Sequence, residues 1–296
     1  MPLTTLPLEA LHARVTGWYE VAGRDLPWRA SDCSPWGVFV SEVMAQQTPL
    51  SRVEPAWREW MERWPTPAAL AAAAPGDAVR AWGRLGYPRR ALRLHEAATA
   101  MVQRHGGEVP STPAGLLALP GVGAYTAAAV ACFAFGVPEV VIDTNVRRVL
   151  VRTLEARQYP APALTRAERE LAAEAMPAQR HTANVWNVAV MELGALVCTA
   201  RGPRCEACPV ADLCAWNLAG RPAHEGPPRR GQAWHGTDRQ VRGALLQRLR
   251  DAHRELPIHL LEDAGPDHAQ VMRCLDSLVA DGLVEPLAGE RYRLPA

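Results

Sequence analysis

Four cysteines stand within 17 residues of the sequence, at the spacing C-x6-C-x2-C-x5-C. Four thiolates this close together can surround a single centre, so they constrain this segment more than any hydrophobic pattern does. Tetrahedral zinc and a cubane iron–sulfur cluster both accept four thiolates, and the spacing alone favours zinc as the commoner metal. The predicted ligands are Cys198, Cys205, Cys208 and Cys214.

The bulk properties of the chain are those of an intracellular globular protein. It has 296 residues, of which 48% are apolar, enough for one large domain or two. Its longest apolar run, near Ala127–Val137, is too short to span a bilayer, and no signal peptide is recognisable. We therefore expect a cytoplasmic protein without membrane association, whose cysteines bind metal or stay reduced.

The sequence contains no lysine, so all of its 32 basic residues are arginine. A genome of high GC content explains this bias together with the excess of Ala and Pro. Its chemical consequence is that no side-chain amine can form a Schiff base. The net charge of +1 does not by itself indicate a nucleic-acid partner.

Helical periodicity dominates the sequence. Apolar residues recur at three- and four-residue spacing in Val53–Trp64, Asp77–Trp82, Ala91–Gln103 and Arg166–Ala175. Ser34-Pro35 predicts a helix start, and Gly136 predicts the end of a helix that begins at Ala124.

The chain after the cysteines has a different character. Residues 217–236 are rich in Gly, Pro, His and Arg and predict a linker. Two helices, Asp238–Arg250 and Asp267–Ala280, and two short strands within Leu283–Leu294 predict a small winged-helix-like module.

Gly121, Val122 and Gly123 lie in a short turn between two predicted helices. The glycines permit close backbone approach, and the N–H groups at the start of the next helix suit a DNA phosphate. A plain helix connection would have the same local sequence, so the turn alone leaves both interpretations open.

Two carboxylates stand out. Glu42 lies on a predicted apolar helix, Pro35–Gln47, with Gln46 four residues later on the same face. Asp143 follows the strand-like run 140–142, and it suits either a catalytic role or an N-cap of the helix through Leu150. Glu42 is open to a purely structural interpretation as well.

These motifs occur in an order that resembles the A/G-specific adenine glycosylases, the MutY branch of the helix-hairpin-helix superfamily. The resemblance covers roughly residues 10–216 and rests on Ser41–Thr48, Leu85–Tyr87, Leu119–Thr126, Val141–Arg148 and the cysteine spacing. It implies an all-α, two-domain fold with a [4Fe–4S] cluster, so iron and sulfide replace zinc as the expected cofactor. The implied domains are a six-helix barrel at 30–136, an iron–sulfur domain of 1–29 and 137–216, the linker at 217–236 and the C-terminal module at 237–296.

The resemblance also implies roles for individual residues around a cleft between the two domains. Glu42 would protonate the departing adenine, which requires a raised pKa in its apolar pocket, and Asp143 would stabilise the sugar cation. Tyr125 and Asn145 would assist near the reacting sugar. The residues implied to contact DNA or the flipped adenine are Arg24, Trp28, Arg29, Gln46, Gln47, Thr48, Tyr87, Gly121, Val122, Gly123 and Glu192.

The expected protein is thus a monomeric, nucleoid-associated bacterial enzyme that removes adenine mispaired with guanine or 8-oxoguanine from double-stranded DNA. A mismatch thymine or uracil glycosylase and a non-catalytic cluster-bearing DNA-damage-binding protein are the alternatives. A related lyase would need a lysine where Tyr125 stands. The sequence departs from the family pattern at Ala45, at Pro88 and in the C-terminal module, which is too short for a MutT-like domain.

Overall fold

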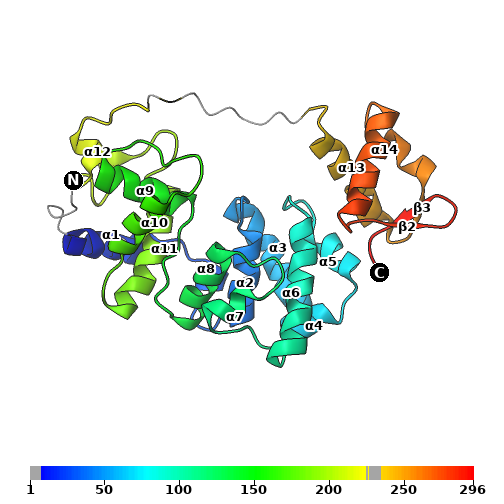
Figure 1. Ribbon diagram of the computed structural model, residues 1–296, viewed down its shortest axis with the longest axis horizontal. Coiled ribbons are helices and arrows are strands. Elements are labelled where there is room, and N and C mark those ends of the chain that lie inside the picture. Colours follow the sequence, from blue (N-terminus) through cyan, green and yellow to red (C-terminus); the bar gives the residue numbers. More distant parts are fainter. Residues whose placement is uncertain (1–7, 225, 227–234) are drawn as a thin grey trace. The chain divides into compact units, whose positions relative to one another are not determined.

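The computed structural model describes residues 8–224, 226 and 235–296, and these residues are mostly helical, as the sequence predicts (Figure 1). They form two compact units. The first unit lies within Met1–Cys33, Ser111–Leu116 and Gly123–Pro228, and the second within Ser34–Pro110, Leu117–Val122 and Arg229–Ala296. The domain boundaries predicted at 29/30, 136/137 and 216/217 stay predictions, and part of the predicted linker, like residues 1–7, lies outside the described residues.

Helices make up the regular structure of the first unit. They are α1 (Leu8–Ala22), η1 (Pro27–Arg29), α7 (Pro113–Leu117), α8 (Ala124–Phe135), α9 (Thr144–Glu155), α10 (Arg166–Glu174), α11 (Arg180–Leu196), η2 (Cys205–Ala207) and α12 (Ala215–Leu218).

The core of the first unit lies where α1 and α9 pack on α11. Leu11 and Val15 of α1 meet the apolar faces of the two other helices there. The start of α10 shows why the local sequence folds as it does. Thr165 accepts a hydrogen bond from the Glu168 amide, and the Glu168 side chain accepts one from the Thr165 amide, forming a capping box.

The second unit contains a helical body and a small mixed module. The body consists of α2 (Pro35–Met44), α3 (Leu50–Arg63), α4 (Pro67–Ala71), α5 (Pro75–Trp82) and α6 (Arg89–His105). The module consists of α13 (Asp238–Ala252), β1 (Leu256–Pro257), η3 (Ile258–Leu260), η4 (Glu262–Ala264), α14 (His268–Ala280), β2 (Glu285–Leu287) and β3 (Arg291–Arg293).

Tryptophans fill the body of the second unit. Helices α4 and α5 both pack on α6. The fully buried Trp60 ring meets Trp64 and Trp82 edge-on, at centroid separations of 4.7 and 5.8 Å. Such edge-to-face pairs are favourable aromatic geometry. Helix α2 packs on α3 and α6, so this core fixes the helix that carries Glu42.

The C-terminal module has the winged-helix-like order that the sequence predicts, with one addition. Its antiparallel sheet has the order β1-β3-β2, and Leu256 of β1 is paired with Tyr292 of β3. The strand β1 was not predicted because a two-residue strand ending in Pro257 has no periodicity to detect.

Two local predictions were wrong. The helix expected over Pro35–Gln47 ends at Met44, since Gln47 has φ 54°, a left-handed conformation outside any α-helix. The strand-like run Val140–Ile142 is extended but belongs to no sheet, and its Val141 amide donates instead to the Asn187 side chain at 3.2 Å.

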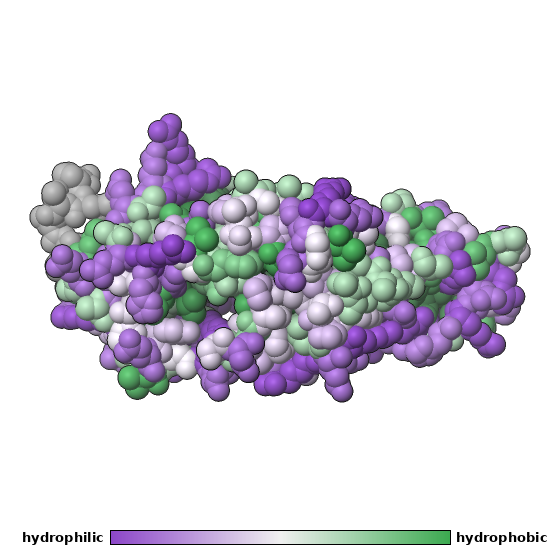
Figure 2. Space-filling view, turned by 90° about the horizontal axis from the view of Figure 1, so that it is seen from below, coloured by the Kyte–Doolittle hydropathy of each residue, from purple (hydrophilic) through white to green (hydrophobic). Residues whose placement is uncertain are grey.

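Figure 2 shows one face of the molecule, on which the most hydrophobic residues lie in small separate spots. Among the helices of the described residues, none is long and apolar enough to cross a membrane.

Glu168 allows a test of the packing in the first unit. Its side chain is 2% exposed and pairs with Arg147, and these hydrogen bonds lower its pKa despite burial, which acts in the opposite direction. We expect Glu168→Ala to lower the free energy of unfolding by about 3 kcal/mol, because it leaves the Arg147 guanidinium, which is 10% exposed, without its counter-charge. Chemical denaturation at neutral pH measures this loss.

The matched control is Glu170→Ala, two residues after Glu168 and on the exposed face of α10. Glu170 pairs with Arg166 at the surface, where the side chains are 53% and 89% exposed. Its loss should cost under about 1 kcal/mol. Equal losses for the two variants would contradict the buried role of Glu168.

Candidate metal centre and active site

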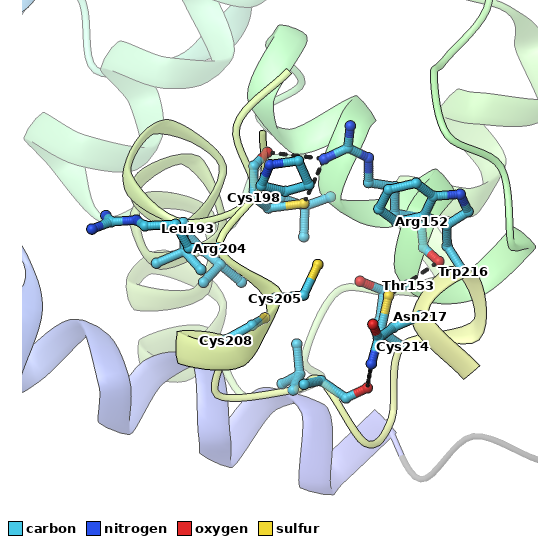
Figure 3. A pocket seen from close by; sticks show the side chains of 15 residues that line it. Arg152, Thr153, Leu193, Cys198, Arg204, Cys205, Cys208, Cys214, Trp216 and Asn217 are labelled. Carbon is cyan, nitrogen blue, oxygen red and sulfur yellow. Dashed lines mark hydrogen bonds between the residues drawn. The ribbon is translucent and has the colours of Figure 1, made fainter. Parts of the chain in front are cut away.

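The four predicted cysteine ligands surround one pocket. Cys198 follows the end of α11, Cys205 and Cys208 flank the η2 turn, and Cys214 precedes α12. Figure 3 shows their sulfur atoms directed into the same space from these separate segments. Apolar side chains complete the lining, among them Val149, Leu193, Val197 and Val210.

Arg152 of α9 supports this pocket from the side. It is 1% exposed, and its guanidinium donates to the Cys198 sulfur at 3.3 Å and to the Thr199 carbonyl at 2.8 Å. The same group lies 4.7 Å from the centre of the Trp216 ring. A buried cation beside a thiolate sulfur compensates the negative charge that four cysteines bring to a metal centre.

Two of these thiols resist ionisation. Burial, together with the neighbouring Cys198, Cys214 and Cys205, raises the pKa of Cys208 to about 11, and burial raises the pKa of Cys214 too. Thiolates are the form that binds metal, so binding must displace these protons. Sulfur donors, apolar walls and a nearby arginine together fit a bound iron–sulfur group.

Asp143 caps the helix that carries Arg152. One of its carboxylate oxygens accepts from the amides of Asn145 at 2.8 Å and Val146 at 2.6 Å, and the other accepts from the Asn145 side chain at 2.8 Å. Burial raises the pKa of Asp143 above its usual value, while these hydrogen bonds and Arg148 act to lower it. The N-cap interpretation is therefore correct, and it leaves a chemical role open.

Arg148 links this cap to the cysteine loop. Its guanidinium donates to the Asn145 side-chain oxygen at 2.6 Å, to the Gly194 carbonyl at 2.7 Å and to the Cys198 carbonyl at 2.7 Å. The close approach needs a glycine, since a Cβ on Gly194 would stand 2.6 Å from the Asn145 Cβ. The Asp143 carboxylate and the first cysteine are thus joined through two side chains.

Glu192 of α11 holds two arginines of the N-terminal segment. It is 1% exposed and accepts from Arg24 at 3.1 Å and from Arg29 at 2.9 Å. Burial raises its pKa, but the two guanidinium groups outweigh burial and lower it, so Glu192 is ionised. Trp28, which lies between Arg24 and Arg29 in the sequence, is buried in the η1 turn. The structure therefore brings together the predicted Arg24, Arg29 and Glu192.

Tyr125 also lies in the first unit. It stands in the first turn of α8, half-buried, and packs against the small cluster of Ala129, Cys132 and Val141. Val141 precedes Asp143 by two residues, so the Tyr125 ring packs against the segment that carries the carboxylate.

Glu42 lies in the second unit, on α2. It is 8% exposed, and its neighbours Phe39, Val43 and Met44 are buried too. The helix forms because Ser34 caps it by accepting from the Gly37 amide at 3.2 Å, and Pro35 occupies its first turn. Glu42 is therefore a carboxyl group held among buried apolar neighbours of its own helix.

Arg90 organises the loop after α2. Its guanidinium donates to the carbonyls of Val43 at 2.9 Å and Gln46 at 2.6 Å, and to the Thr48 hydroxyl at 3.1 Å. The Thr48 hydroxyl donates in turn to the Leu85 carbonyl at 3.0 Å. Desolvation lowers the pKa of Arg90 to about 10. Arg90 therefore joins Gln46–Thr48 to the loop before Tyr87.

Tyr87 and Gln47 have unusual backbones. Their φ angles are 48° and 54°, in the left-handed region that non-glycine residues avoid, and the Tyr87 side chain is 49% exposed. Strained positions that display a large side chain are frequent at functional sites.

The predicted hairpin turn has the expected backbone. Gly121 has φ 74°, and a Cβ there would stand 2.6 Å from the Arg93 Cβ on α6. The Val122 amide donates to the Leu119 carbonyl at 3.3 Å. Gly123 is the N-cap residue of α8. Because glycine has no side chain, it cannot accept a hydrogen bond from the first amides of this helix.

Sequence reasoning missed the structural importance of Arg90, Arg148 and Arg152. A signal was present for the last two, because both share the apolar face of α9 with Val149 and Thr153, where an arginine needs a buried partner. Arg90 gave no such signal, because three other arginines surround it in sequence.

Comparison with known families gives two matches. The model described as HhH-GPD superfamily base excision DNA repair protein matches residues 40–174. The model described as iron-sulfur binding domain of endonuclease III matches residues 198–214, the segment of the four cysteines. The prediction of an iron–sulfur centre in this part of the chain is thereby confirmed.

Curated relatives are similar over nearly the full length. The chain is 50% identical over 298 residues to an adenine DNA glycosylase of Mycobacterium tuberculosis, covering 99% of this chain and 96% of the relative. It is 51% identical over 278 residues to an adenine DNA glycosylase of Mycolicibacterium smegmatis, covering 94% and 93%.

A solved structure confirms the fold class. A thermostable thymine-DNA glycosylase superposes with a TM-score of 0.63 at 26% sequence identity, covering 72% of this chain and 97% of that one. That protein is named for thymine, whereas the two mycobacterial relatives are named for adenine.

The cysteine loop predicts a clear difference between cysteines. We expect Cys205→Ser to lose most bound iron, since one of four ligands inside an apolar pocket is removed. Cys33→Ser is the control, because Cys33 lies far from the loop in sequence and is absent from the pocket lining. Iron analysis and the visible absorption of the purified proteins measure the difference. Iron retained in both variants would contradict the assignment.

Proposed function

The chain belongs to the adenine DNA glycosylase family of HhH-GPD base excision DNA repair proteins, and on this premise we propose that it hydrolyses the N-glycosidic bond of adenine mispaired with guanine or 8-oxoguanine in double-stranded DNA. The observation that carries the proposal is the burial of Glu42 in an apolar helix, which suits a proton donor to a purine leaving group. A DNA substrate places the enzyme with the nucleoid of the bacterial cytoplasm, and we propose that it acts as a monomer.

Each carboxylate has a separate task in the proposed reaction. Glu42 delivers a proton to the adenine ring as the bond to the sugar breaks and its electron pair moves onto the base. Asp143, ionised, then stabilises the oxocarbenium-like sugar or captures it, and water completes the hydrolysis. The fixed hydrogen bonds to Asp143 leave its charge in place without a rearrangement.

The residues around the two carboxylates are proposed to handle the DNA. The target base must leave the stack before it can react. Tyr87 is proposed to enter the gap, with Gln46, Gln47 and Thr48 beside it, and Gly121–Gly123 is proposed to bind a phosphate. Arg24, Trp28, Arg29 and Glu192 are proposed to line the adenine pocket, and Tyr125 and Asn145 to assist near the sugar.

We also propose that the iron–sulfur group is a [4Fe–4S] cluster held by Cys198, Cys205, Cys208 and Cys214. When bound, such a cluster cross-links the loop and gives it a fixed shape. Iron and acid-labile sulfide should both be about four per chain. One zinc and no sulfide would overturn the assignment.

Base release from a panel of mispaired duplexes tests the reaction. Adenine opposite guanine or 8-oxoguanine should be released, leaving an unbroken abasic strand, because without a lysine the chain has no side-chain amine for strand cleavage. Release of thymine or uracil would favour the alternative suggested by the thymine-DNA glycosylase structure. Binding without any release would favour a damage-binding protein.

Substitution of the two carboxylates should separate binding from chemistry. Glu42→Gln should slow single-turnover release of adenine by about 10²–10⁴-fold while the Kd for mispaired DNA stays similar. Asp143→Asn should be severely slowed too, and it should fold normally because Asn is also a good N-cap. Glu59→Gln, an exposed residue of α3, is the control. A wild-type rate for Glu42→Gln would overturn its role.

The partners of Asp143 predict a change in pH dependence. Asp143 must be ionised, so the rate should rise with pH through its raised pKa. Asn145→Ala removes a hydrogen bond that lowers this pKa, so the acid limb of the rate profile should move to higher pH. Single-turnover rates measured from acid to neutral pH, with circular dichroism as the check on folding, test the shift. An unmoved acid limb would argue that another group controls it.

A further inference from the structure

Two guanidinium groups contact the exposed Tyr87 ring. The guanidinium carbon of Arg90, on α6, lies 5.4 Å from the ring centre. That of Arg239, in the first turn of α13, lies 5.8 Å from it. Both distances are within the range of cation–π attraction. Arg239 belongs to the C-terminal module, so this part of the chain reaches the residue proposed to enter the DNA stack.

The far end of α13 is fixed to α5 by hydrogen bonds from arginine side chains to backbone carbonyls. Arg250 is 8% exposed, and its guanidinium donates to the Val79 carbonyl at 3.0 Å. Arg80 donates in the opposite direction, to the carbonyl of Arg250 at the C-terminal end of α13. A cation at this end of a helix is favourable, because the last carbonyls have no partner within the helix.

The chain end and α14 add two more attachments. The Gly76 amide donates to the Pro295 carbonyl at 2.7 Å, and a Cβ on Gly76 would stand 2.4 Å from that oxygen. Asp281, at the end of α14, pairs with Arg89 of α6 at 3.2 Å and with Arg242 of α13 at 2.6 Å. Arg89 is two residues from Tyr87, so this attachment holds α13 close to the ring.

The charge of the module argues against a second DNA-reading surface. Residues 235–296 contain ten acidic residues against eight arginines. DNA-binding modules of this size are usually basic, since phosphate contacts supply most of their affinity. On α14, the helix that would enter a groove in DNA-binding winged helices, the exposed Arg273 pairs with Asp238 at 3.1 Å.

We propose that the C-terminal module is a brace for Tyr87, with Arg239 as a positioning residue that holds the ring ready to enter the DNA stack. This inference rests on the proposed function of the site. An exposed tyrosine samples several rotamers, and ordering it at the moment of binding costs conformational entropy. Contact with Arg239 and Arg90 orders the ring beforehand, so insertion requires less free energy.

A double-mutant cycle on the full chain tests the brace. The probe is a duplex with a non-hydrolysable adenine nucleotide opposite guanine and 2-aminopurine beside it, whose fluorescence reports unstacking. Arg239→Ala should weaken binding and the fluorescence change about two- to fivefold. Arg239→Lys should restore part of the loss, and Arg291→Ala, an exposed arginine of β3, should have no effect.

The cycle is completed in a Tyr87→Leu background. There Arg239→Ala should have no further effect, because its target ring is gone. The salt dependence of binding should also be unchanged by Arg239→Ala. An effect that persists without Tyr87, or a salt slope lower by about one unit, would overturn the brace and assign Arg239 to a phosphate contact.

The docking of the module is tested without DNA. Gly76 and Gly17 both lie in helices, where Gly→Ala normally raises stability. Gly17→Ala should raise the Tm, because nothing stands within 4 Å of the added Cβ. Gly76→Ala should lower the Tm and weaken the 2-aminopurine response as Arg239→Ala does. A raised Tm for Gly76→Ala would show that the module is not seated on α5.

The proposed function and the brace can fail separately. Wild-type protein that neither binds the probe duplex nor unstacks it overturns the proposed function, and the brace falls with it. Wild-type protein that does both, while Arg239→Ala matches it, overturns the brace alone.

Discussion

Hydrogen bonds from buried arginines on α9 are the constraint on which the first unit depends. Arg152 holds the cysteine loop by its carbonyls and one sulfur, and Arg148 holds the Cys198 carbonyl with one nitrogen and the Asn145 side chain with another. They are four positions apart on one helix, which places both guanidinium groups on the same face. The cluster loop and the Asp143 cap are therefore built on a single rigid element.

Arginine has the same task in the second unit. Arg90 donates to the carbonyls of Val43 and Gln46 at the end of α2 and just after it. Arg80 and Arg250 each donate to a backbone carbonyl of the helix that carries the other. Lysine could not replace them easily, because its single ammonium lacks the planar fork that reaches several carbonyls at once. The absence of lysine therefore has two consequences. No side-chain amine is available to form a Schiff base, and arginine supplies the hydrogen bonds that join separate backbone segments.

The sequence predicted more of the candidate site residues than of the residues that hold them in place. Periodicity located α3, α5, α6 and α10 to within a few residues, and the cysteine spacing identified the loop. It could not find the end of α2, because the left-handed Gln47 has no compositional mark, nor β1, which is too short to show a period. It gave no sign of the role of Arg90, since only the folded chain brings the carbonyls of Val43 and Gln46 to it. For Asp143 the sequence left two interpretations open, an N-cap and a catalytic role. The two are compatible, because a carboxylate that caps a helix is held in a fixed orientation.

The proposed second role of Asp143 would limit how the protein approaches its substrate. A side chain that caps α9 through two amides and the Asn145 side chain cannot swing outward without unwinding the first turn of the helix. In the proposed reaction the carboxylate therefore stays in place, and the sugar has to be brought to it. The work of alignment then falls on the nucleic acid, whose bending and unstacking cost a few kcal/mol each. Duplexes that are already weakened at the mispair would bring their sugar to the Asp143 carboxylate most readily. How easily the DNA bends and unstacks would then affect which sites are selected, before the base itself is recognised.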